Sequence, residues 1–120
     1  MSAESRALQV QLNWVDSAAI LTVGGEVDAA SAPQLQSGIE DALGAEPALL
    51  VVDLSGVRFF GSAGLSVLLF AVEAAAKDGL RVVASAQVRR PIEVTGLDGI
   101  LDVFDSLQDA LASGDTPDVA

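Results

Sequence analysis

The sequence predicts an α/β domain in which about four helices cover a mixed sheet of four or five strands. Residues 8–15 alternate apolar with polar side chains, the period-two pattern of a half-buried strand. Residues 48–54 and 80–86 are short aliphatic runs, typical of strands that are buried on both faces. The segment between them has apolar residues at helical spacing. The three segments therefore predict a strand–helix–strand unit with parallel strands and a right-handed crossover.

The first two strands are expected to form an antiparallel hairpin. Residues 18–25 supply the second strand after a turn at Asp16–Ser17, and Gly24–Gly25 are expected to end it. The first helix then begins with Ser31 as its cap and Pro33 in its first turn, where a missing N–H costs little. The apolar residues of this helix share one face: Leu35, Ile39, Ala42 and Leu43.

The second half of the chain predicts three further helices. After a connection through residues 55–62, the second helix is expected to begin near Ser62 and to stop at Gly79. A short third helix should follow Pro91. A short strand should then lead into a fourth helix that is capped by Ser106.

Length and composition indicate one domain, residues 8–112, between a flexible N-terminal segment (1–7) and a flexible acidic tail (113–120). The net charge is −11, which repels nucleic acid and anionic membranes and favours a protein partner. The chain has no cysteine, so disulfides and thiolate metal sites are excluded. No signal pattern and no apolar run of about 18 residues is present, so we expect a cytoplasmic protein.

Ser62 is the candidate functional residue. It lies in a small polar interruption, Gly61–Gly64, of the otherwise apolar stretch VRFFGSAGLSVLLF at residues 57–70. One interpretation is that its hydroxyl caps the second helix by accepting an amide hydrogen bond. The other is that it accepts a phosphate, which the free amides and the helix dipole would favour. Glycines on both sides suit either interpretation, since they give backbone freedom and leave the hydroxyl unshielded.

Acidic side chains are expected around this hydroxyl. Glu26 and Asp28 lie between a strand and a helix start, where they are either solvated acids or part of a polar rim around Ser62. Asp53 and Ser55, after the buried strand, are further candidates for the same edge. The adjacent bases Arg89 and Arg90 are expected to be solvated or to form ion pairs within the chain.

The second helix is apolar on two sides, so one side must pack on the sheet. The other lies under neighbouring helices or forms an apolar docking patch for another protein. The two groups are Leu65, Leu68, Leu69 and Val72 on one stripe, and Val67, Phe70, Ala71 and Ala74 on much of the opposite side.

Catalysis is not expected. The chain has no histidine, and the serine elbow Gly-x-Ser-x-Gly is incomplete because Phe60 occupies its first position. Lys77 is too far along the second helix to activate Ser62. No phosphate-binding loop and no calcium loop is present, so no metal or cofactor is expected.

Four segments resemble the STAS domain, specifically the bacterial anti-sigma factor antagonists, in order and spacing over roughly residues 8–112. They are GGEVDAASAPQL (24–35), LVVDLSGVRFFGSAGLSVLL (50–69), GLRVVASA (79–86) and GLDGILDVFDSLQDAL (96–111). The resemblance implies a partner-switching protein: its unphosphorylated form binds an anti-sigma factor that is also a serine kinase and thereby frees a sigma factor. Phosphorylation of one serine breaks the complex, and a serine phosphatase reverses it.

Position by position, the resemblance makes Ser62 the phosphoacceptor, and Asp28 matches an acid near the acceptor. The family usually has aspartate before the acceptor, where this chain has Gly61, and Ala63 leaves a single hydroxyl in the turn. The predicted partner-binding residues are Glu26, Asp28, Gly61, Ser62, Ala63, Gly64, Leu65, Ser66 and Leu69. The alternative is a STAS-type sensor or scaffold domain that binds a nucleotide or another anionic ligand without phosphorylation.

Overall fold

Five strands form one mixed sheet in the order β1-β2-β3-β4-β5 in the computed structural model, which describes residues 7–112. The hairpin β1–β2 is antiparallel, and all other neighbours are parallel. The hairpin and the strand–helix–strand unit are therefore confirmed. The strands are β1 (Gln9–Val15), β2 (Ala18–Val27), β3 (Leu49–Phe60), β4 (Leu80–Val83) and β5 (Val103–Phe104).

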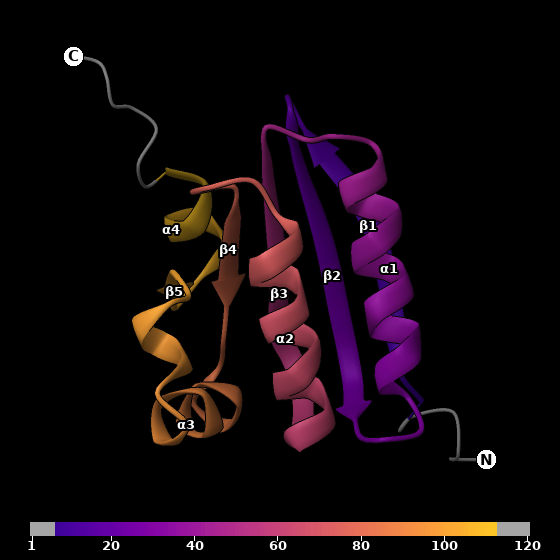
Figure 1. Ribbon diagram of the computed structural model, residues 1–120, viewed down its shortest axis with the longest axis vertical. Coiled ribbons are helices and arrows are strands. Elements are labelled where there is room, and N and C mark those ends of the chain that lie inside the picture. The colour runs from indigo at the N-terminus through magenta and orange to yellow at the C-terminus, as the bar shows by residue number, and fades with distance from the viewer. Residues whose placement is uncertain (1–6, 113–120) are drawn as a thin grey trace.

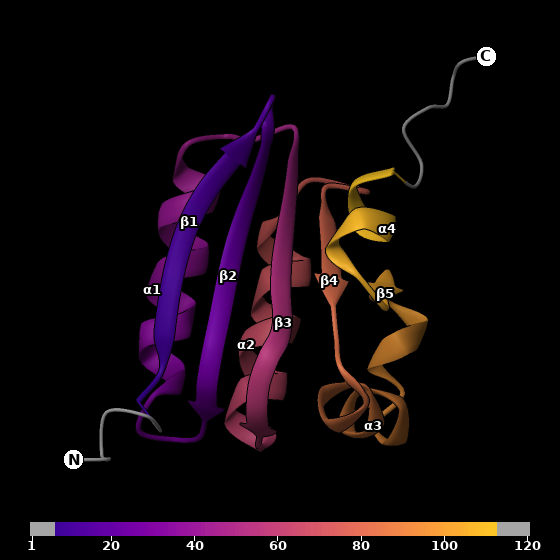
Figure 2. The same ribbon diagram turned by 180° about the vertical axis from the view of Figure 1, so that it is seen from behind.

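Helices α1 (Ala32–Gly44) and α2 (Ser62–Ala74) lie side by side over one face of the sheet (Figure 1). Helix α3 (Ala86–Val94) and the 3₁₀ turn η2 (Leu97–Gly99) follow β4. Helix α4 (Leu107–Ala112) lies over the opposite face, on the β4–β5 side (Figure 2). The expected number of α-helices is confirmed within the part of the chain that the structure describes.

The main core fills the space between the sheet and helices α1 and α2. It is aliphatic, as expected for parallel strands that are covered by helices. Its fully buried members include Leu21, Leu35, Ile39, Leu50, Val52, Leu54 and Leu68. A smaller cluster on the other face joins Ile20, Val51 and Val83 to Ala110 of α4. Side chains that alternate along the strands thus contribute apolar residues to the cores on both faces of the sheet.

Strands β2 and β3 continue further than their sequences predict. Gly24–Gly25 do not end β2: they lie at two shifts of its register with β3, where the chain also approaches Ala7 closely. A Cβ atom at Gly25 would lie 2.4 Å from the Ala7 carbonyl oxygen, and its φ is +99°. These glycines therefore mark an irregularity within the strand. Most of the connection expected at residues 55–62 is strand as well, because β3 extends to Phe60.

Three other boundaries also differ from the prediction. Helix α2 ends at Ala74, and Gly79 belongs to a turn in which its amide donates to the Ala76 carbonyl at 2.8 Å. Strand β4 stops at Val83, short of residue 86, because Ser85 already caps α3. Pro91 lies inside α3.

Burial explains why α3 accommodates its proline. Val88 and Ile92, one turn apart on the same helix face, are fully buried in the main core. Packing of this face outweighs the hydrogen bond that Pro91 cannot donate. Helix α3 therefore begins well before the proline that was expected to precede it.

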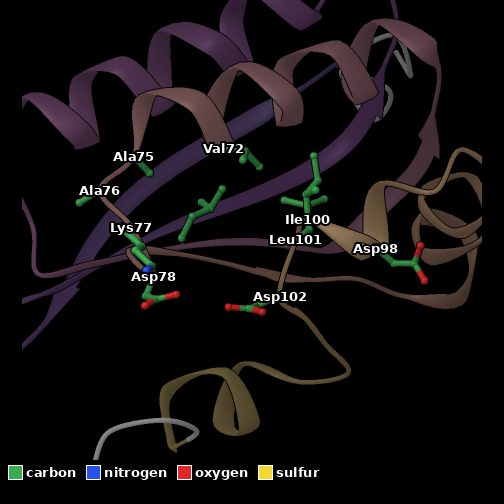
Figure 3. Close-up of a pocket in the computed structure, with 11 residues that line it drawn as sticks. Val72, Ala75, Ala76, Lys77, Asp78, Asp98, Ile100, Leu101 and Asp102 are labelled. Carbon is green, nitrogen blue, oxygen red and sulfur yellow. The ribbon is translucent and has the colours of Figure 1, made fainter.

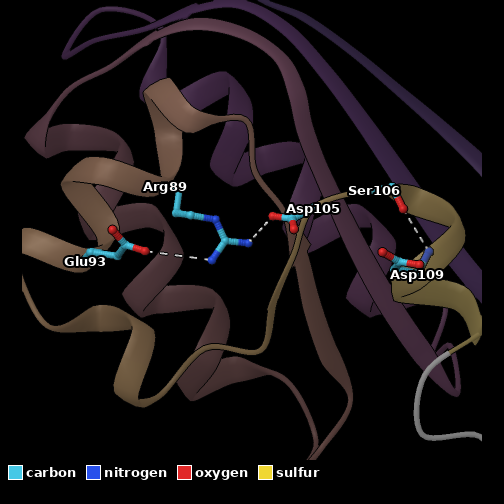
Figure 4. Close-up of polar contacts among 5 residues, drawn as sticks. All are labelled: Arg89, Glu93, Asp105, Ser106 and Asp109. Atoms are coloured by element: carbon cyan, nitrogen blue, oxygen red, sulfur yellow. Dashed lines mark hydrogen bonds and ion pairs between the residues drawn. The ribbon is translucent and has the colours of Figure 1, made fainter.

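The C-terminal segment is held to α3 by polar contacts (Figure 4). The Arg89 guanidinium lies 2.7 Å from the Asp105 carboxylate and 3.9 Å from that of Glu93, so the expected ion pairing of Arg89 is confirmed. The Ser106 hydroxyl accepts the Asp109 amide at 3.1 Å, which confirms the cap of α4. The flexible ends predicted at 1–7 and 113–120 lie, except for Ala7, outside the described residues. Within 7–112, no helix has the length and apolarity to cross a membrane.

Candidate functional site

The ends of β2 and β3 hold the start of α2. Glu26 pairs with Phe59 and Val27 with Phe60 in the parallel register. Immediately beyond, the Gly61 amide donates to the Val27 carbonyl at 2.9 Å. This bond extends the contact between the two chain segments into the turn that carries Ser62. The position of the turn is therefore set by the central strands of the sheet.

Ser62 is the first residue of α2, and Gly61 is its N-cap, so the prediction that Ser62 caps the helix is wrong. Gly61 has the extended backbone that a cap requires (φ −89°, ψ −174°), and its carbonyl accepts the amides of Gly64 and Leu65 at 3.0 and 3.2 Å. The Ser62 side chain is exposed. Its hydroxyl has no hydrogen-bond partner within residues 7–112, and neither the Ser62 amide nor the Ala63 amide has a backbone acceptor there.

Gly64 matters for its lack of a side chain rather than for backbone freedom, because its conformation is helical. A Cβ atom there would lie 2.8 Å from Cε1 and Cζ of Phe60 and 2.9 Å from Cγ1 of Val27. Gly64 is itself buried. The absence of a side chain at Gly64 therefore lets the first turn of α2, which carries Ser62, pack directly on the ends of β2 and β3.

The remaining predicted site residues of α2 differ in exposure. Ala63 and Leu65 are half-buried and pack against the main core, whereas Ser66 is exposed. Leu69 is also exposed, with 42% of its surface accessible. The sheet-facing side of the helix is formed by Gly64, Val67, Leu68 and Ala71, a stripe that takes members from both of the predicted groups.

A shallow groove of about 560 Å³ runs between α1 and α2 beside Ser62. Ala63 and Ser66 form its α2 side, and the α1 side is lined by small or polar residues. The α1 side, with the loop before it, consists of Ala29, Ala32, Pro33, Gln36, Ser37 and Glu40. Two predicted partner-binding residues therefore open onto a concave surface.

Asp28 organises the loop before α1. Its Oδ1 accepts the Ala30 and Ser31 amides, each at 3.0 Å. The Ser31 hydroxyl accepts the Asp28 amide at 3.0 Å and lies 2.9 Å from the Glu26 carbonyl, to which it can donate. Ser31 thus occupies the predicted cap position without capping an α1 amide through its side chain. The Ser31 hydroxyl also lies 3.1 Å from Asp28 Oδ1, so its one proton is shared between this carboxylate and the Glu26 carbonyl. The hydrogen bond from the Ser31 amide, and then that from its hydroxyl, hold the pKa of Asp28 below 3.8.

The other predicted acids divide into two locations. Glu26 is half-buried next to Phe59 on the neighbouring strand, so it belongs to the site edge. Asp53 does not: it pairs with Thr22 and Val83 inside the sheet, and its carboxylate accepts the Ser55 hydroxyl at 2.7 Å. The prediction that Asp53 and Ser55 line the Ser62 edge is wrong, because β3 continues beyond them to Phe60.

A second pocket lies near the other end of α2 and contains none of the predicted site residues (Figure 3). It has a volume of about 340 Å³, and Val72 and Ala75 contribute to its wall. Asp78, Asp98 and Asp102 line it, but they do not form a group that could hold a metal ion, and no other such group occurs in residues 7–112. This pocket therefore adds nothing to the Ser62 site.

Phe59 lies next to the candidate site, and the sequence analysis did not identify it. Its side chain is 52% exposed, whereas Phe60 next to it is buried. Neighbouring residues of a strand point to opposite sides, so a strand reaching Phe60 cannot bury both rings beneath α2. The consecutive pair Phe59–Phe60 implies one exposed ring if it lies on a strand. The sequence analysis instead expected a connection at these residues, so it did not draw this conclusion.

Comparison with known proteins identifies the family. The family model for the STAS domain matches residues 9–110. The anti-sigma-F factor antagonist RsfB of Mycobacterium tuberculosis is 41% identical over 95 residues, covering 78% of each chain. RsfA, an anti-sigma-F factor antagonist of the same organism, is 32% identical over 114 residues, covering 91% of this chain and 89% of RsfA.

A solved structure gives the same result. The crystal structure of an anti-sigma factor antagonist from Mycobacterium paratuberculosis superposes with a TM-score of 0.85 at 37% identity, covering 89% of this chain and 93% of that one. The fold, the matched residues and the identity over most of the length agree. The chain therefore belongs to the STAS domain family.

Proposed function

We propose that this protein is an anti-sigma factor antagonist of the cytoplasm, regulatory rather than catalytic. In its unphosphorylated form it binds an anti-sigma factor with serine kinase activity and frees a sigma factor for transcription. A serine phosphatase restores this form after phosphorylation. Relatives that match most of the chain carry the name anti-sigma-F factor antagonist. The observation that carries the proposal is the exposed Ser62 hydroxyl, which no described residue engages, at the start of α2.

The proposed modification is phosphorylation of the Ser62 hydroxyl. The Ser62 oxygen forms a bond to the γ-phosphorus of ATP, the bond from that phosphorus to the leaving oxygen of ADP breaks, and the hydroxyl proton passes to solvent or to a base of the kinase. The Ser62 and Ala63 amides, which have no backbone acceptor among residues 7–112, and the positive end of the α2 dipole favour the new negative charge. The turn can therefore hold a phosphate without rebuilding its backbone.

The same charge would expel the partner. If the complex brings a carboxylate to ~7 Å from a phosphate of charge near −2, the two are repelled by ~2–5 kcal/mol at an effective dielectric of 20–40, before salt screening. That corresponds to a loss of affinity of roughly 30-fold to several thousand-fold. Ordering this charge against exposed apolar side chains such as Leu69 adds a desolvation cost. No conformational change of the domain is needed.

The proposal is tested with the anti-sigma-F factor of Mycobacterium tuberculosis, the class of protein that the relatives' names specify. With ATP it should add ~80 Da to the wild type at Ser62. Ser62→Ala should bind without being modified, and Ser62→Glu should lose binding. Ser17→Ala, which removes an exposed hydroxyl in the turn between β1 and β2, at the opposite end of the strands from Ser62, is the matched control and should behave as the wild type. Equal binding by Ser62→Glu and the wild type would contradict the switch.

The alternative function is a sensor or scaffold domain that binds a nucleotide or another anion without covalent change. The Ser62 and Ala63 amides favour it, because no backbone acceptor in the described part of the chain pairs with them. Titration with ATP, GTP and inorganic phosphate in the absence of any kinase distinguishes the two functions. Saturable binding that shifts the Ser62 and Ala63 amide signals would support the sensor.

A further inference from the structure

An exposed aromatic ring stands beside the proposed phosphoacceptor. Half of the Phe59 side chain is accessible (52%). Among residues 7–112, the other exposed large apolar side chains are Leu12, Trp14, Val15, Leu69, Val94 and Ile100. Phe59 differs from these because its ring edge packs on Gly61, the cap residue that precedes Ser62. We propose that Phe59 is the apolar anchor by which this surface binds its anti-sigma factor, an inference that rests on the proposed function.

The fold keeps the ring at the surface. Val57 and Phe60 direct their side chains into the main core, and Phe59 leaves β3 on the outward side. Its neighbour across the parallel ladder is Glu26, which is half-buried. Phe59 therefore lies between Glu26 on the neighbouring strand and the Ser62 turn that follows it in the chain. This is the arrangement of an interface anchor, an apolar centre with a polar rim.

Gly61 contributes to the position of the Phe59 ring. A Cβ atom at Gly61 would lie 3.2 Å from Cε2 and 3.4 Å from Cζ of Phe59, so a side chain at position 61 would displace the ring by a few tenths of an ångström. Glycine at this position therefore allows the ring edge to pack against the cap residue of α2, and Phe59 supplies the contact surface.

This geometry specifies the partner's chemistry. The anti-sigma factor should offer an apolar pocket next to the groups that approach the Ser62 hydroxyl. The Phe59 ring packs on Gly61, the residue directly before Ser62, so a partner that buries the ring also covers the Ser62 hydroxyl. A phosphate added at Ser62 would then stand at the mouth of that pocket, where water is excluded and a charge is most costly.

The test measures affinity for the anti-sigma-F factor of Mycobacterium tuberculosis by calorimetry. Phe59→Ala should weaken binding at least ~10-fold, as expected for an aromatic anchor, and Phe59→Tyr should retain it because the ring remains. Ile100→Ala is the matched control: this side chain is 55% exposed but borders the pocket near the other end of α2, so binding should be unchanged. Urea unfolding of each variant shows whether it is folded.

A double-mutant cycle tests the role of Gly61. Gly61→Ala should weaken binding in the wild-type background and should have much less effect when Phe59 is already alanine. Undiminished binding by a folded Phe59→Ala variant would overturn the inference while leaving the proposed function intact. Failure of the wild type itself to bind would overturn the proposed function and, with it, this inference.

Discussion

Replacing Gly64 by alanine should destabilise the protein, although the same change ordinarily strengthens a helix. Gly→Ala inside a helix is normally worth roughly 0.5–1 kcal/mol of stability. Here the new Cβ atom would meet the Phe60 ring at 2.8 Å and Val27 at 2.9 Å. Both neighbours are buried and cannot swing into solvent. Overpacking of this kind costs ~1–3 kcal/mol, so a net loss of about 1–2 kcal/mol is expected.

Urea unfolding followed by circular dichroism measures this loss, and the melting temperature should fall by roughly 4–9 °C in a domain of this size. Gly44→Ala is the matched control, because Gly44 is the last residue of α1 and no atom lies within 4 Å of the Cβ position. It should leave the stability unchanged or raise it by up to ~1 kcal/mol. Equal stability of the Gly64→Ala and Gly44→Ala variants would refute the close approach of α2 to the strand ends.

Three further predictions concern polar contacts. Ser106→Ala should cost ~1 kcal/mol of stability by removing the acceptor of the Asp109 amide, as chemical denaturation would show. Arg89→Ala should cost less than ~1 kcal/mol, and the difference should shrink in 1 M salt, since its partner Asp105 is exposed. Asp28 should titrate below 3.8 by carboxyl NMR. Because its folded pKa is lowered, its contribution to stability is present above pH 3.8 and is lost as the pH falls through the folded value, a dependence that Asp28→Ala should lack.

Patterns that depend on local spacing were predictive. The alternation of residues 8–15, the aliphatic runs of β3 and β4 and the helical stripes of α1 and α2 identified the hairpin, the parallel unit and their order. The expected start of the second helix near Ser62 is also confirmed. These features follow from side-chain periodicity, which the sequence displays directly.

Features that depend on close approach between distant segments were not predictable. Gly24–Gly25 resemble a strand end, but the irregular pairing with β3 absorbs them. Pro91 resembles a helix start, but burial of Val88 and Ile92 extends α3 across it. Ser62 resembles a cap, yet the cap is Gly61, because the register of β2 with β3 fixes where the strand ends. In each case tertiary packing decides between two locally acceptable conformations.

The bond between the Gly61 amide and the Val27 carbonyl gives the site a built-in reference for spectroscopy. The Gly61 proton should exchange slowly with deuterium, whereas its two successors, which have no backbone acceptor within residues 7–112, should exchange quickly. An anion or a partner bound at the turn would slow exchange at the Ser62 and Ala63 amides and leave exchange at the Gly61 amide unchanged. Three consecutive amides would thus distinguish occupancy of the turn from a general tightening of the molecule.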